Sequence, residues 1–279
     1  MRLTVRAAAA GAAMIVAAHW CGPLHAQTQQ QVDACEGKGN LPLDTAIGSC
    51  TALIQSGHYV GRDLSTVFVI RATAYQRKGE LERAIADYDQ AIGLDPSGAT
   101  AYYNRGVAYG SKGDWDRAIQ DYDQAIKLKP SAEAHFNRGN AYLGKSQYAS
   151  AIDDYNQAIK LKPDLAPGFD NRCWARAVVG ILKPALADCN EALRLAPNNA
   201  ATLNSRGFVF LKMTQFDAAV SDYDAALRID PMLAFARYGL GLAKLKNEDA
   251  TGEADMAAAK ALQADIAEEY GRYGISDAR

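Results

Sequence analysis

The sequence predicts an all-α fold in which helical hairpins stack side by side as an α-solenoid. One stretch, AIADYDQAIGLDP at residues 84–96, returns four more times in related form. The prolines that close the five copies are spaced 34, 33, 34 and 34 residues apart: Pro96, Pro130, Pro163, Pro197 and Pro231. A fixed period of this length is typical of stacked repeats, in which each unit packs on its neighbours.

Each period contains two helical stretches. In residues 99–131 the first stretch places Tyr102, Gly106 and Tyr109 on one helical face. Gly113 interrupts this pattern, and glycine commonly follows the end of a helix. The second stretch ends at the closing proline, because proline cannot continue a helix and restricts the residue before it. Every period therefore predicts one helical hairpin.

The period divides the chain into nine segments. We expect a signal peptide, a degenerate half-repeat with a connector, five regular repeats, a degenerate sixth repeat and a C-terminal cap. Their residues are 1–26, 27–64, 65–98, 99–131, 132–165, 166–199, 200–233, 234–268 and 269–279. On the last helical stretch, residues 266–273, Glu268 and Glu269 suit the polar end that a stacked array needs.

The N-terminus is typical of a secretory signal peptide. Arg2 and Arg6 precede an apolar run at residues 7–18, which is too short and too rich in alanine for a good membrane span. Ala26 offers a small residue at the cleavage point, so the mature chain is expected to begin near Gln27. The alternative is a disordered cytosolic leader. Export predicts a periplasmic or secreted protein that does not insert into the membrane after cleavage.

Net charge and cysteine content limit the classes of function. The whole chain carries a net charge of −2, and loss of residues 1–26 removes two arginines and no acid, leaving −4. This balance gives no electrostatic case for nucleic acid or anionic membrane. The four cysteines of the mature chain are an even number, which indicates two bridges in an oxidising compartment. The alternatives are four buried thiols or, less favoured, a zinc site.

The repeat pattern resembles the tetratricopeptide repeat family. That pattern asks for a large residue, a small residue and an aromatic on the first helix, then alanine, aromatic, alanine and proline on the second. The repeat 99–131 fills these places with Tyr102, Gly106, Tyr109, Ala118, Tyr122, Ala125 and Pro130. The resemblance covers about residues 65–268. It implies a right-handed superhelix of hairpins in which the first helices line a concave surface.

The fourth repeat departs from the family pattern in a way that predicts disulfide pairing. Cys173 takes its small place and Cys189 its second-helix aromatic place, which face each other across a hairpin. Cys50 takes the same aromatic place in the degenerate half-repeat, with Cys35 almost the same distance before it. We therefore expect the pairs Cys173–Cys189 and Cys35–Cys50.

Catalytic motifs are missing from the sequence. The mature chain has only His58, in a connector, and His135, in a packing place of its repeat. No phosphate-binding loop or dinucleotide fingerprint is present. We expect no enzymatic activity and no cofactor or metal.

One charged pattern repeats in all five regular units. Arginine precedes the small residue of the first helix, and aspartate precedes the ring position of the second. The residues are Arg71, Arg105, Arg138, Arg172 and Arg206, with Asp87, Asp121, Asp154, Asp188 and Asp222. The pattern predicts a structural ladder of Arg–Asp pairs; the alternative is a row of anion-binding sites.

A groove on the first helices is the candidate binding site. The resemblance places its floor on the second, fifth, sixth, ninth, twelfth and thirteenth residues of each repeat, here called the floor places. They include Tyr103, Asn104, Phe136, Asn137, Asn140, Asp170, Asn171, Trp174, Asn204 and Phe208. Aromatic rings beside asparagine amides suit an extended peptide. We expect the site to be centred on Trp174, unless this ring instead packs against Phe208.

Three functions remain open from the sequence. The first is an exported scaffold that docks a segment of another protein in the groove. The second is an accessory subunit of a cell-envelope assembly or secretion complex that uses its convex face or its ends. The third is an enzyme or a small-ligand sensor. The pattern identifies neither the partner nor the oligomeric state, since fold alone does not determine function.

Overall fold

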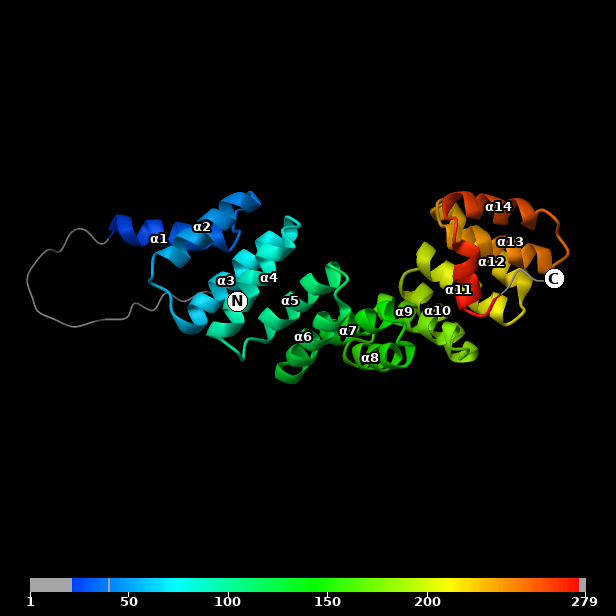
Figure 1. The fold of residues 1–279 in the computed structure, drawn as a ribbon, viewed down its shortest axis with the longest axis horizontal. Coiled ribbons are helices and arrows are strands. Elements are labelled where there is room, and N and C mark those ends of the chain that lie inside the picture. Colours follow the sequence, from blue (N-terminus) through cyan, green and yellow to red (C-terminus); the bar gives the residue numbers. More distant parts are fainter. Residues whose placement is uncertain (1–21, 40, 276–279) are drawn as a thin grey trace, which may run out of the picture. The chain divides into compact units, whose positions relative to one another are not determined.

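The computed structural model describes residues 22–39 and 41–275, and all regular secondary structure within them is α-helical (Figure 1). Residues 1–21 of the expected signal peptide and residues 276–279 of the expected cap lie outside this described part. The chain divides into two compact units, residues 1–130 and 131–279. Each unit is a stack of antiparallel helical hairpins, as the period predicts.

The N-terminal unit contains three hairpins. The opening hairpin joins α1 and α2, and the two regular repeats follow. The helices are α1 (Gly22–Cys35), α2 (Leu43–Gln55), α3 (Gly61–Arg77), α4 (Leu81–Leu94), α5 (Ala99–Ser111) and α6 (Trp115–Leu128). Within this unit α2 packs on α3, and α4 packs on α5.

The C-terminal unit contains four hairpins and one further helix. The helices are α7 (Ala132–Gly144), α8 (Tyr148–Leu161), α9 (Ala166–Val178), α10 (Leu182–Leu195), α11 (Ala200–Lys212), α12 (Phe216–Ile229), α13 (Ala234–Lys246), α14 (Gly252–Leu262) and α15 (Ile266–Arg272). The first helices α9, α11 and α13 pack on one another in order. Helix α15 turns back and contacts both α13 and α14.

The turn inside each hairpin depends on one left-handed residue, the fifteenth of every repeat. These residues are Gly79, Gly113, Ser146, Gly180, Thr214 and Glu248, with φ between 57° and 82°. A left-handed residue closes the first helix and reverses the chain within a few residues. Glu248 shows that the sixth repeat keeps this turn although its sequence has lost the family's proline.

Glycine in the first helix lets the second helix approach closely. A Cβ atom at Gly106, Gly139 or Gly207 would lie 2.7–2.9 Å from a ring carbon of the tyrosine that faces it, closer than real contacts allow. Those tyrosines are Tyr122, Tyr155 and Tyr223. The small and aromatic places of the sequence pattern are therefore a direct contact between the two helices of one hairpin.

Two disulfides join the pairs of cysteines expected from the sequence. Cys173 and Cys189 replace the glycine–tyrosine contact of the fourth repeat, with 5.4 Å between their Cα atoms. Cys35 and Cys50 join α1 to α2, with 4.8 Å between their Cα atoms. All four side chains are buried. Each disulfide therefore links the two helices of one hairpin at the place where a tyrosine ring packs in the regular repeats.

The repeated arginines and aspartates form a structural ladder. In every regular repeat the arginine Nε and one terminal nitrogen donate to the two oxygens of one aspartate, at 2.6–2.9 Å. The aspartates are only 3–6 % exposed. Burial raises the pKa of Asp121, which the Arg105 guanidinium opposes. Because these arginines already hold buried carboxylates, they do not form a row of open anion sites.

The same arginines also connect neighbouring repeats. The remaining guanidinium nitrogen of Arg172 donates to Asn156 Oδ1 at 2.7 Å, and that of Arg206 to Asn190 Oδ1 at 2.9 Å. Both acceptors lie on the second helix of the preceding repeat. In the fourth repeat Arg176 replaces the first-helix aromatic residue and adds a second arginine to Asp188, at 2.6 Å. The ladder therefore supports the stacking that the period requires.

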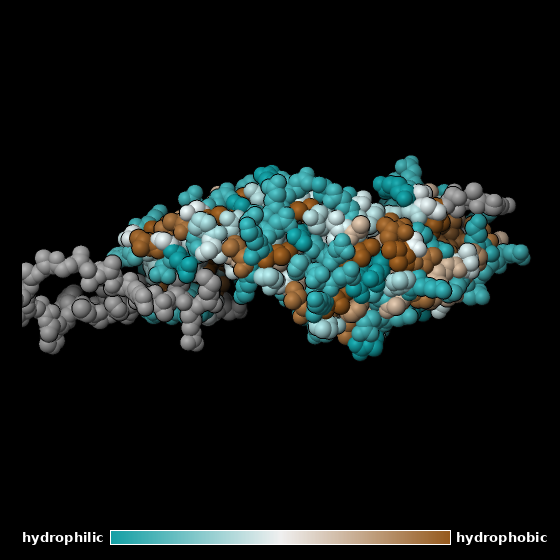
Figure 2. Space-filling model, turned by 90° about the horizontal axis from the view of Figure 1, so that it is seen from below, coloured by the Kyte–Doolittle hydropathy of each residue, from teal (hydrophilic) through white to brown (hydrophobic). Residues whose placement is uncertain are grey.

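None of the helices in the described residues combines the length and the apolar character that a membrane span needs. The face in Figure 2 mixes hydrophilic and hydrophobic side chains.

Candidate functional site

Two adjoining pockets open on the first-helix face of the N-terminal unit. Each has a volume of about 470 Å³, and they share Thr73, Arg77 and Asn104. The floor places of the first regular repeat are Thr66, Val69, Ile70, Thr73, Gln76 and Arg77. All six line one pocket or the other. The two pockets therefore form one continuous site, here called the N-terminal floor.

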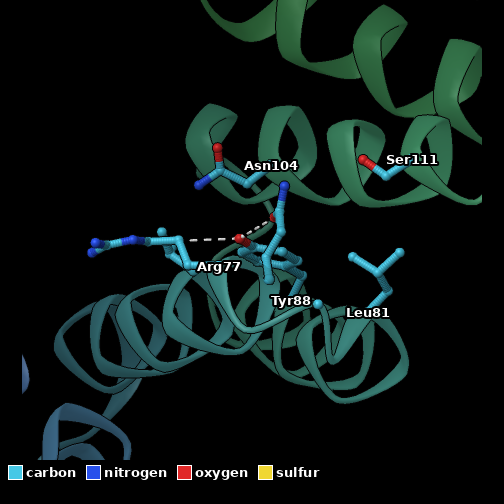
Figure 3. Close-up of a pocket in the computed structure, with 8 residues that line it drawn as sticks. Arg77, Leu81, Tyr88, Asn104 and Ser111 are labelled. Atoms are coloured by element: carbon cyan, nitrogen blue, oxygen red, sulfur yellow. Dashed lines mark hydrogen bonds between the residues drawn. The ribbon is translucent and has the colours of Figure 1, made fainter. Parts of the chain in front are cut away.

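The first pocket has a tyrosine hydroxyl at its base (Figure 3). Tyr88 reaches up from α4 and donates to Gln76 Oε1 at 3.0 Å, and its oxygen lies 3.2 Å from Thr73 Oγ1. Burial raises the pKa of Tyr88 to about 12, against an opposing contribution from hydrogen bonding to Thr73 and Asn104. The hydroxyl therefore stays protonated at neutral pH and holds the floor side chains in place.

The second pocket gains a wall from the opening hairpin. Its lining combines first-helix floor residues with α1, α2 and the loop between them: Cys35, Glu36, Gly37, Lys38, Leu41, Leu43 and Ala46. The Cys35–Cys50 disulfide fixes α1 against α2 and so holds this wall. The lining mixes apolar side chains with amide and charged groups.

One cation at the N-terminal floor is available to a ligand. Arg77 is exposed and lines both pockets, and no acidic side chain among the described residues pairs with it. Lys38, by contrast, pairs with Asp33 and Glu36 at 2.6 and 2.8 Å. The amides of Gln76 and Asn104 supply donors and acceptors beside Arg77. This set of groups suits a peptide backbone with a carboxylate nearby.

His58 and His135 are not among the residues that line the N-terminal floor. Among residues 22–39 and 41–275, no group of histidine, cysteine, aspartate and glutamate side chains could hold a metal ion. His135 Nδ1 lies 3.0 Å from Asp154 Oδ1, within the ladder of the third repeat. His58 is exposed in its connector. Both positions agree with the roles that the sequence indicated.

The structure places the sequence-predicted floor residues in both units. In the N-terminal unit Asn104 lines both pockets, whereas Tyr103 packs its ring 6.0 Å from that of Tyr122. In the C-terminal unit Asn140 Oδ1 accepts hydrogen bonds from Asn171 and Tyr155, each at 2.8 Å. Phe136 and Asn137 are partly buried on the same first helix as Asn140.

Trp174 lies in a ring cluster. Its ring centroid is 4.9 Å from that of Phe208 and 5.2 Å from that of Phe235. The C-terminal Tyr273 also packs edge-on against Trp174, at 5.3 Å. Phe208 is fully buried, which differs from the open floor position expected for it, because this cluster covers its ring. The packing alternative considered for Trp174 is therefore what the structure contains.

Two buried floor acceptors accompany the ring cluster. Asp170 Oδ1 and Asn204 Oδ1 receive no hydrogen bond from the described residues. Burial raises the pKa of Asp170, and the hydroxyl groups of Ser205 and Thr202 oppose that rise. Asp170 lies one helical turn before Trp174, so a buried carboxyl borders the ring cluster.

Sequence reasoning missed most of the N-terminal floor. It named Asn104 but not Thr73, Gln76 or Arg77, although the same floor places, counted in repeat 65–98, identify all three. It also missed that the C-terminal end packs on Trp174. The periodic pattern carries no signal for that contact, because Tyr273 lies beyond the last repeat.

Comparison with family models finds tetratricopeptide repeats along the chain. A model described as "TPR repeat" matches residues 72–113, and one described as "Tetratricopeptide repeat" matches residues 99–131 and 132–165. A further model with the latter description matches residues 206–269. Together these matches span more than half of the chain. A comparison with curated proteins found no match.

Solved structures of similar fold include three of interest. A tetratricopeptide repeat protein from Parabacteroides merdae is 18% identical, with a TM-score of 0.63 over 90% of this chain and 98% of that one. PilW, described as a type IV pilus biogenesis factor, is 19% identical, with a TM-score of 0.63 over 76% and 99%. YrrB, described as having an unusual peptide-binding site, is 23% identical, with a TM-score of 0.59 over 68% and 97%. These identities establish a shared fold alone.

Proposed function

Because the chain belongs to the tetratricopeptide repeat family, we propose that it is a non-enzymatic scaffold that binds an extended segment of a partner protein on its first-helix face. Folds of this family serve as protein-interaction scaffolds, and the solved structures similar to this chain include a peptide-binding protein and a pilus biogenesis factor. The proposal concerns the surface used, the partner's chemistry and the cell compartment.

The observation that supports this proposal best is the N-terminal floor. Its pockets lie on the floor places of a first helix, where the family resemblance implies that a ligand binds. Pocket lining that mixes apolar side chains with a few well-placed polar groups is typical of binding sites. A partner segment would bury apolar side chains against Val69 and Ile70 and exchange main-chain hydrogen bonds with Gln76 and Asn104.

Arg77 indicates the partner's charge. An exposed guanidinium with no acidic neighbour can pair bidentately with a carboxylate. We therefore expect the bound segment to carry an acidic residue that meets Arg77. In the C-terminal unit, Phe136, Asn137, Asn140 and Asn171 are proposed as a further stretch of floor, whose amides are already partly used within the protein.

Export is the proposed localisation. Two disulfides are unusual in a reducing cytosol and fit a periplasmic or secreted protein, as does the signal-like N-terminus. PilW, which shares the fold, is a type IV pilus biogenesis factor. A partner in the cell envelope is therefore part of this proposal.

A second candidate, an accessory subunit of a cell-envelope assembly or secretion complex that uses its convex face or its ends, is favoured by one observation. The last helical residue before four of the closing turns is an exposed aliphatic side chain, 36–51% accessible: Leu94, Leu128, Leu161 and Ile229. Exposed apolar side chains that recur once per repeat can serve as contacts for another subunit. Variants of the floor separate the two functions.

Capture from an envelope extract tests the proposal. The chain from Gln27 onward is immobilised, and the bound proteins are compared with those bound by Arg77→Glu and Asn104→Ala. Arg228→Glu is the matched control, because Arg228 is exposed on α12 away from the floor places. Loss of the same protein with both floor variants, and its retention by the control, is expected. Equal capture by every variant would favour the accessory-subunit function.

A further inference from the structure

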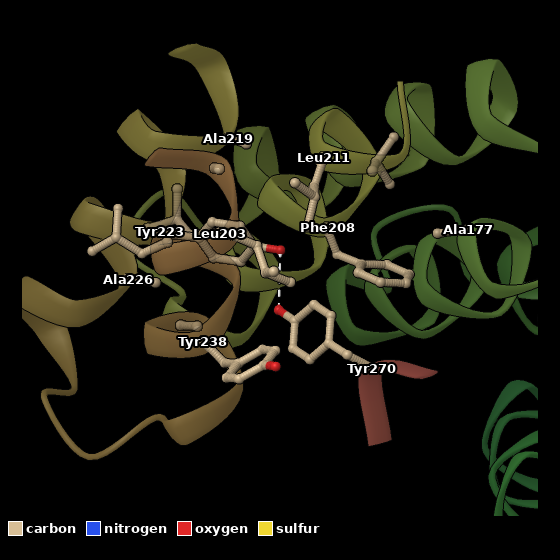
Figure 4. Packing of buried hydrophobic residues seen from close by; sticks show 14 of the residues in the cluster. Ala177, Leu203, Phe208, Leu211, Ala219, Tyr223, Ala226, Tyr238 and Tyr270 are labelled. Atoms are coloured by element: carbon tan, nitrogen blue, oxygen red, sulfur yellow. Dashed lines mark hydrogen bonds between the residues drawn. The ribbon is translucent and has the colours of Figure 1, made fainter. Parts of the chain in front are cut away.

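Residues 266–275 pack on first helices of the C-terminal unit, and Figure 4 shows the buried Tyr270 of this segment. Helix α15 is anchored by Tyr270, which is fully buried and stacks on Phe235 with 4.2 Å between ring centroids. The Tyr270 hydroxyl donates to the main-chain oxygen of Phe235 at 2.9 Å. Gly239 makes this possible, since a Cβ atom there would lie 2.3 Å from the Tyr270 oxygen. Tyr270 is thus part of the core.

The three described residues that follow helix α15, Tyr273–Ile275, are here called the latch. Tyr273 is only partly buried and packs at 5.3 Å on Trp174, 6.0 Å on Phe208 and 6.2 Å on Phe235. Its main-chain oxygen accepts a hydrogen bond from Lys212 Nζ at 3.2 Å. The latch therefore contributes the aromatic side chain and the main-chain carbonyl of Tyr273 to this surface, and the partly buried Ile275 also packs against the core cluster.

The surface under the latch corresponds to the N-terminal floor. Trp174 and Phe208 are the ninth residues of their repeats, and Lys212 is a thirteenth. In the first regular repeat the same places hold Thr73 and Arg77, which line the open pockets. In the C-terminal unit residues 273–275 thus cover the places that stay open in the N-terminal unit.

We propose that Trp174, Phe208, Phe235 and Lys212 form a second segment-binding site, which the latch fills as an internal ligand until a partner segment displaces it. The displacing segment presents an aromatic side chain in the place of Tyr273 and a main-chain carbonyl to Lys212. This inference rests on the proposed use of the first-helix face. It adds a second site, with aromatic rather than acidic preference.

The latch is held more weakly than the helix before it. Its main-chain N–H groups bond only within the tail: Tyr273 and Ile275 donate to the oxygen of Tyr270, and Gly274 donates to that of Gly271, at 3.0–3.1 Å. Gly274 is left-handed, with φ of 77°, and so permits the chain to turn away. Tyr270 can stay buried while the latch leaves.

The hydrogen bonds of Lys212 explain why a displacing segment should present a main-chain carbonyl. Its ammonium donates to the main-chain oxygens of Val178 and Tyr273, both at 3.2 Å, and lies 5.4 Å from the Phe208 ring centre. Burial lowers the pKa of this ammonium, and no carboxylate among the described residues contacts it. When the latch leaves, Lys212 loses one of its two acceptors. A displacing segment that presents a carbonyl restores this acceptor to the partly buried ammonium.

A peptide probe tests this site in the chain from Gln27 onward. The probe is a fluorescein-labelled copy of residues 269–275, EYGRYGI, and binding is followed by fluorescence anisotropy. A tethered ligand outcompetes a free one, so we expect Tyr273→Ala protein to bind the probe at least about tenfold more tightly than the parent. Adding Lys212→Met should abolish that gain. A probe with Tyr273→Ala should not bind, and Gln90→Ala protein, altered at an exposed residue of α4 in the other unit, should behave as the parent.

Hydrogen–deuterium exchange of the parent chain gives a second readout, which needs no variant to fold. Excess unlabelled EYGRYGI should speed exchange at the amides of Tyr273, Gly274 and Ile275 and leave the Tyr270 amide unchanged. Equal probe binding by parent and Tyr273→Ala, or no binding by a folded Tyr273→Ala, overturns the proposal. So does unchanged exchange in the parent, or a concentration-dependent dimer of Tyr273→Ala, since the occupant is then a second copy.

Failure of this second site and failure of the proposed function give different results. If the peptide displaces the latch but envelope capture does not depend on Arg77 and Asn104, the second site stands and the N-terminal floor assignment falls. If capture depends on those residues but the peptide leaves the latch unchanged, the N-terminal floor assignment stands and the second site falls.

Discussion

The rings of Trp174 and Tyr273 meet edge to face, 5.3 Å apart, although one belongs to the fourth repeat and the other follows the last helix. Edge-to-face pairs add to the stability that burial alone provides. Together with its contacts to Phe208 and Phe235, this contact packs the partly buried Trp174 against the C-terminal core cluster, although Trp174 is also a floor residue. Its replacement therefore affects stability.

Replacing Trp174 by alanine should lower the free energy of unfolding by about 3 kcal/mol, because the ring packs on three others and its loss leaves a cavity. Trp174→Phe, which keeps a ring, should lose much less. Urea titration followed by circular dichroism measures both. A loss of less than about 1 kcal/mol for the alanine variant would mean that the ring lies on an open surface.

The contact between Gly139 and Tyr155 should tolerate no extra methyl group without cost. In Gly139→Ala the Cβ atom would lie 2.7 Å from the Tyr155 ring, so we expect a loss of about 1–3 kcal/mol through overpacking. Gly110→Ala is the control within another first helix, because its Cβ atom would meet side chains only at 3.7 Å. It should stabilise the helix by about 0.5–1 kcal/mol. Thermal unfolding distinguishes the two.

The Cys173–Cys189 bridge substitutes for a glycine–tyrosine contact, which can be tested by exchange. Replacing both cysteines by serine should cost about 3 kcal/mol, the value for closing a loop of this size in the chain-entropy model. The pair Cys173→Gly and Cys189→Tyr restores the contact of the other repeats and should recover part of that loss. Equal stability of the two double variants would contradict the idea that the disulfide takes the place of the glycine–tyrosine contact.

Features that recur in every repeat can be predicted from the sequence, whereas contacts that occur only once cannot. The hairpins, the Arg–Asp ladder and the cysteine pairs follow from slots that recur every 33–34 residues, so one repeat explains the next. The latch lies outside the period, and its partners Trp174 and Lys212 are distant along the chain. The sequence of the opening hairpin departs too far from the repeat pattern to predict that Lys38 and Leu41 line a pocket. Contacts that occur once leave no trace in a repeating pattern.

Asp170 gives a dependence of stability on pH. Burial raises its pKa above the ordinary value of 3.8, so the folded protein holds this proton more tightly than the unfolded chain. Stability contributed by the protonated form is present below that value and is lost as pH rises through the folded pKa. Asp170→Asn should therefore be more stable than the parent at about pH 7 and equal to it at about pH 3.

The matched control for this titration is Asp164→Asn, because Asp164 is exposed in a turn. Denaturant unfolding at the two pH values compares the three proteins. A parent that is more stable than Asp170→Asn at neutral pH would show that the carboxylate is satisfied by hydrogen bonds and not penalised by burial.

Site-specific photocrosslinking in living cells tests the central claim most directly, namely that a partner segment lies on the N-terminal floor. A photoreactive amino acid replaces Thr73, which lines both pockets, or Gln90, which is exposed on the second helix of the same repeat. The account predicts one discrete protein adduct from position 73, lost when Arg77→Glu is added, and none from position 90. An adduct from position 90 alone, or one from position 73 that persists with Arg77→Glu, would contradict it.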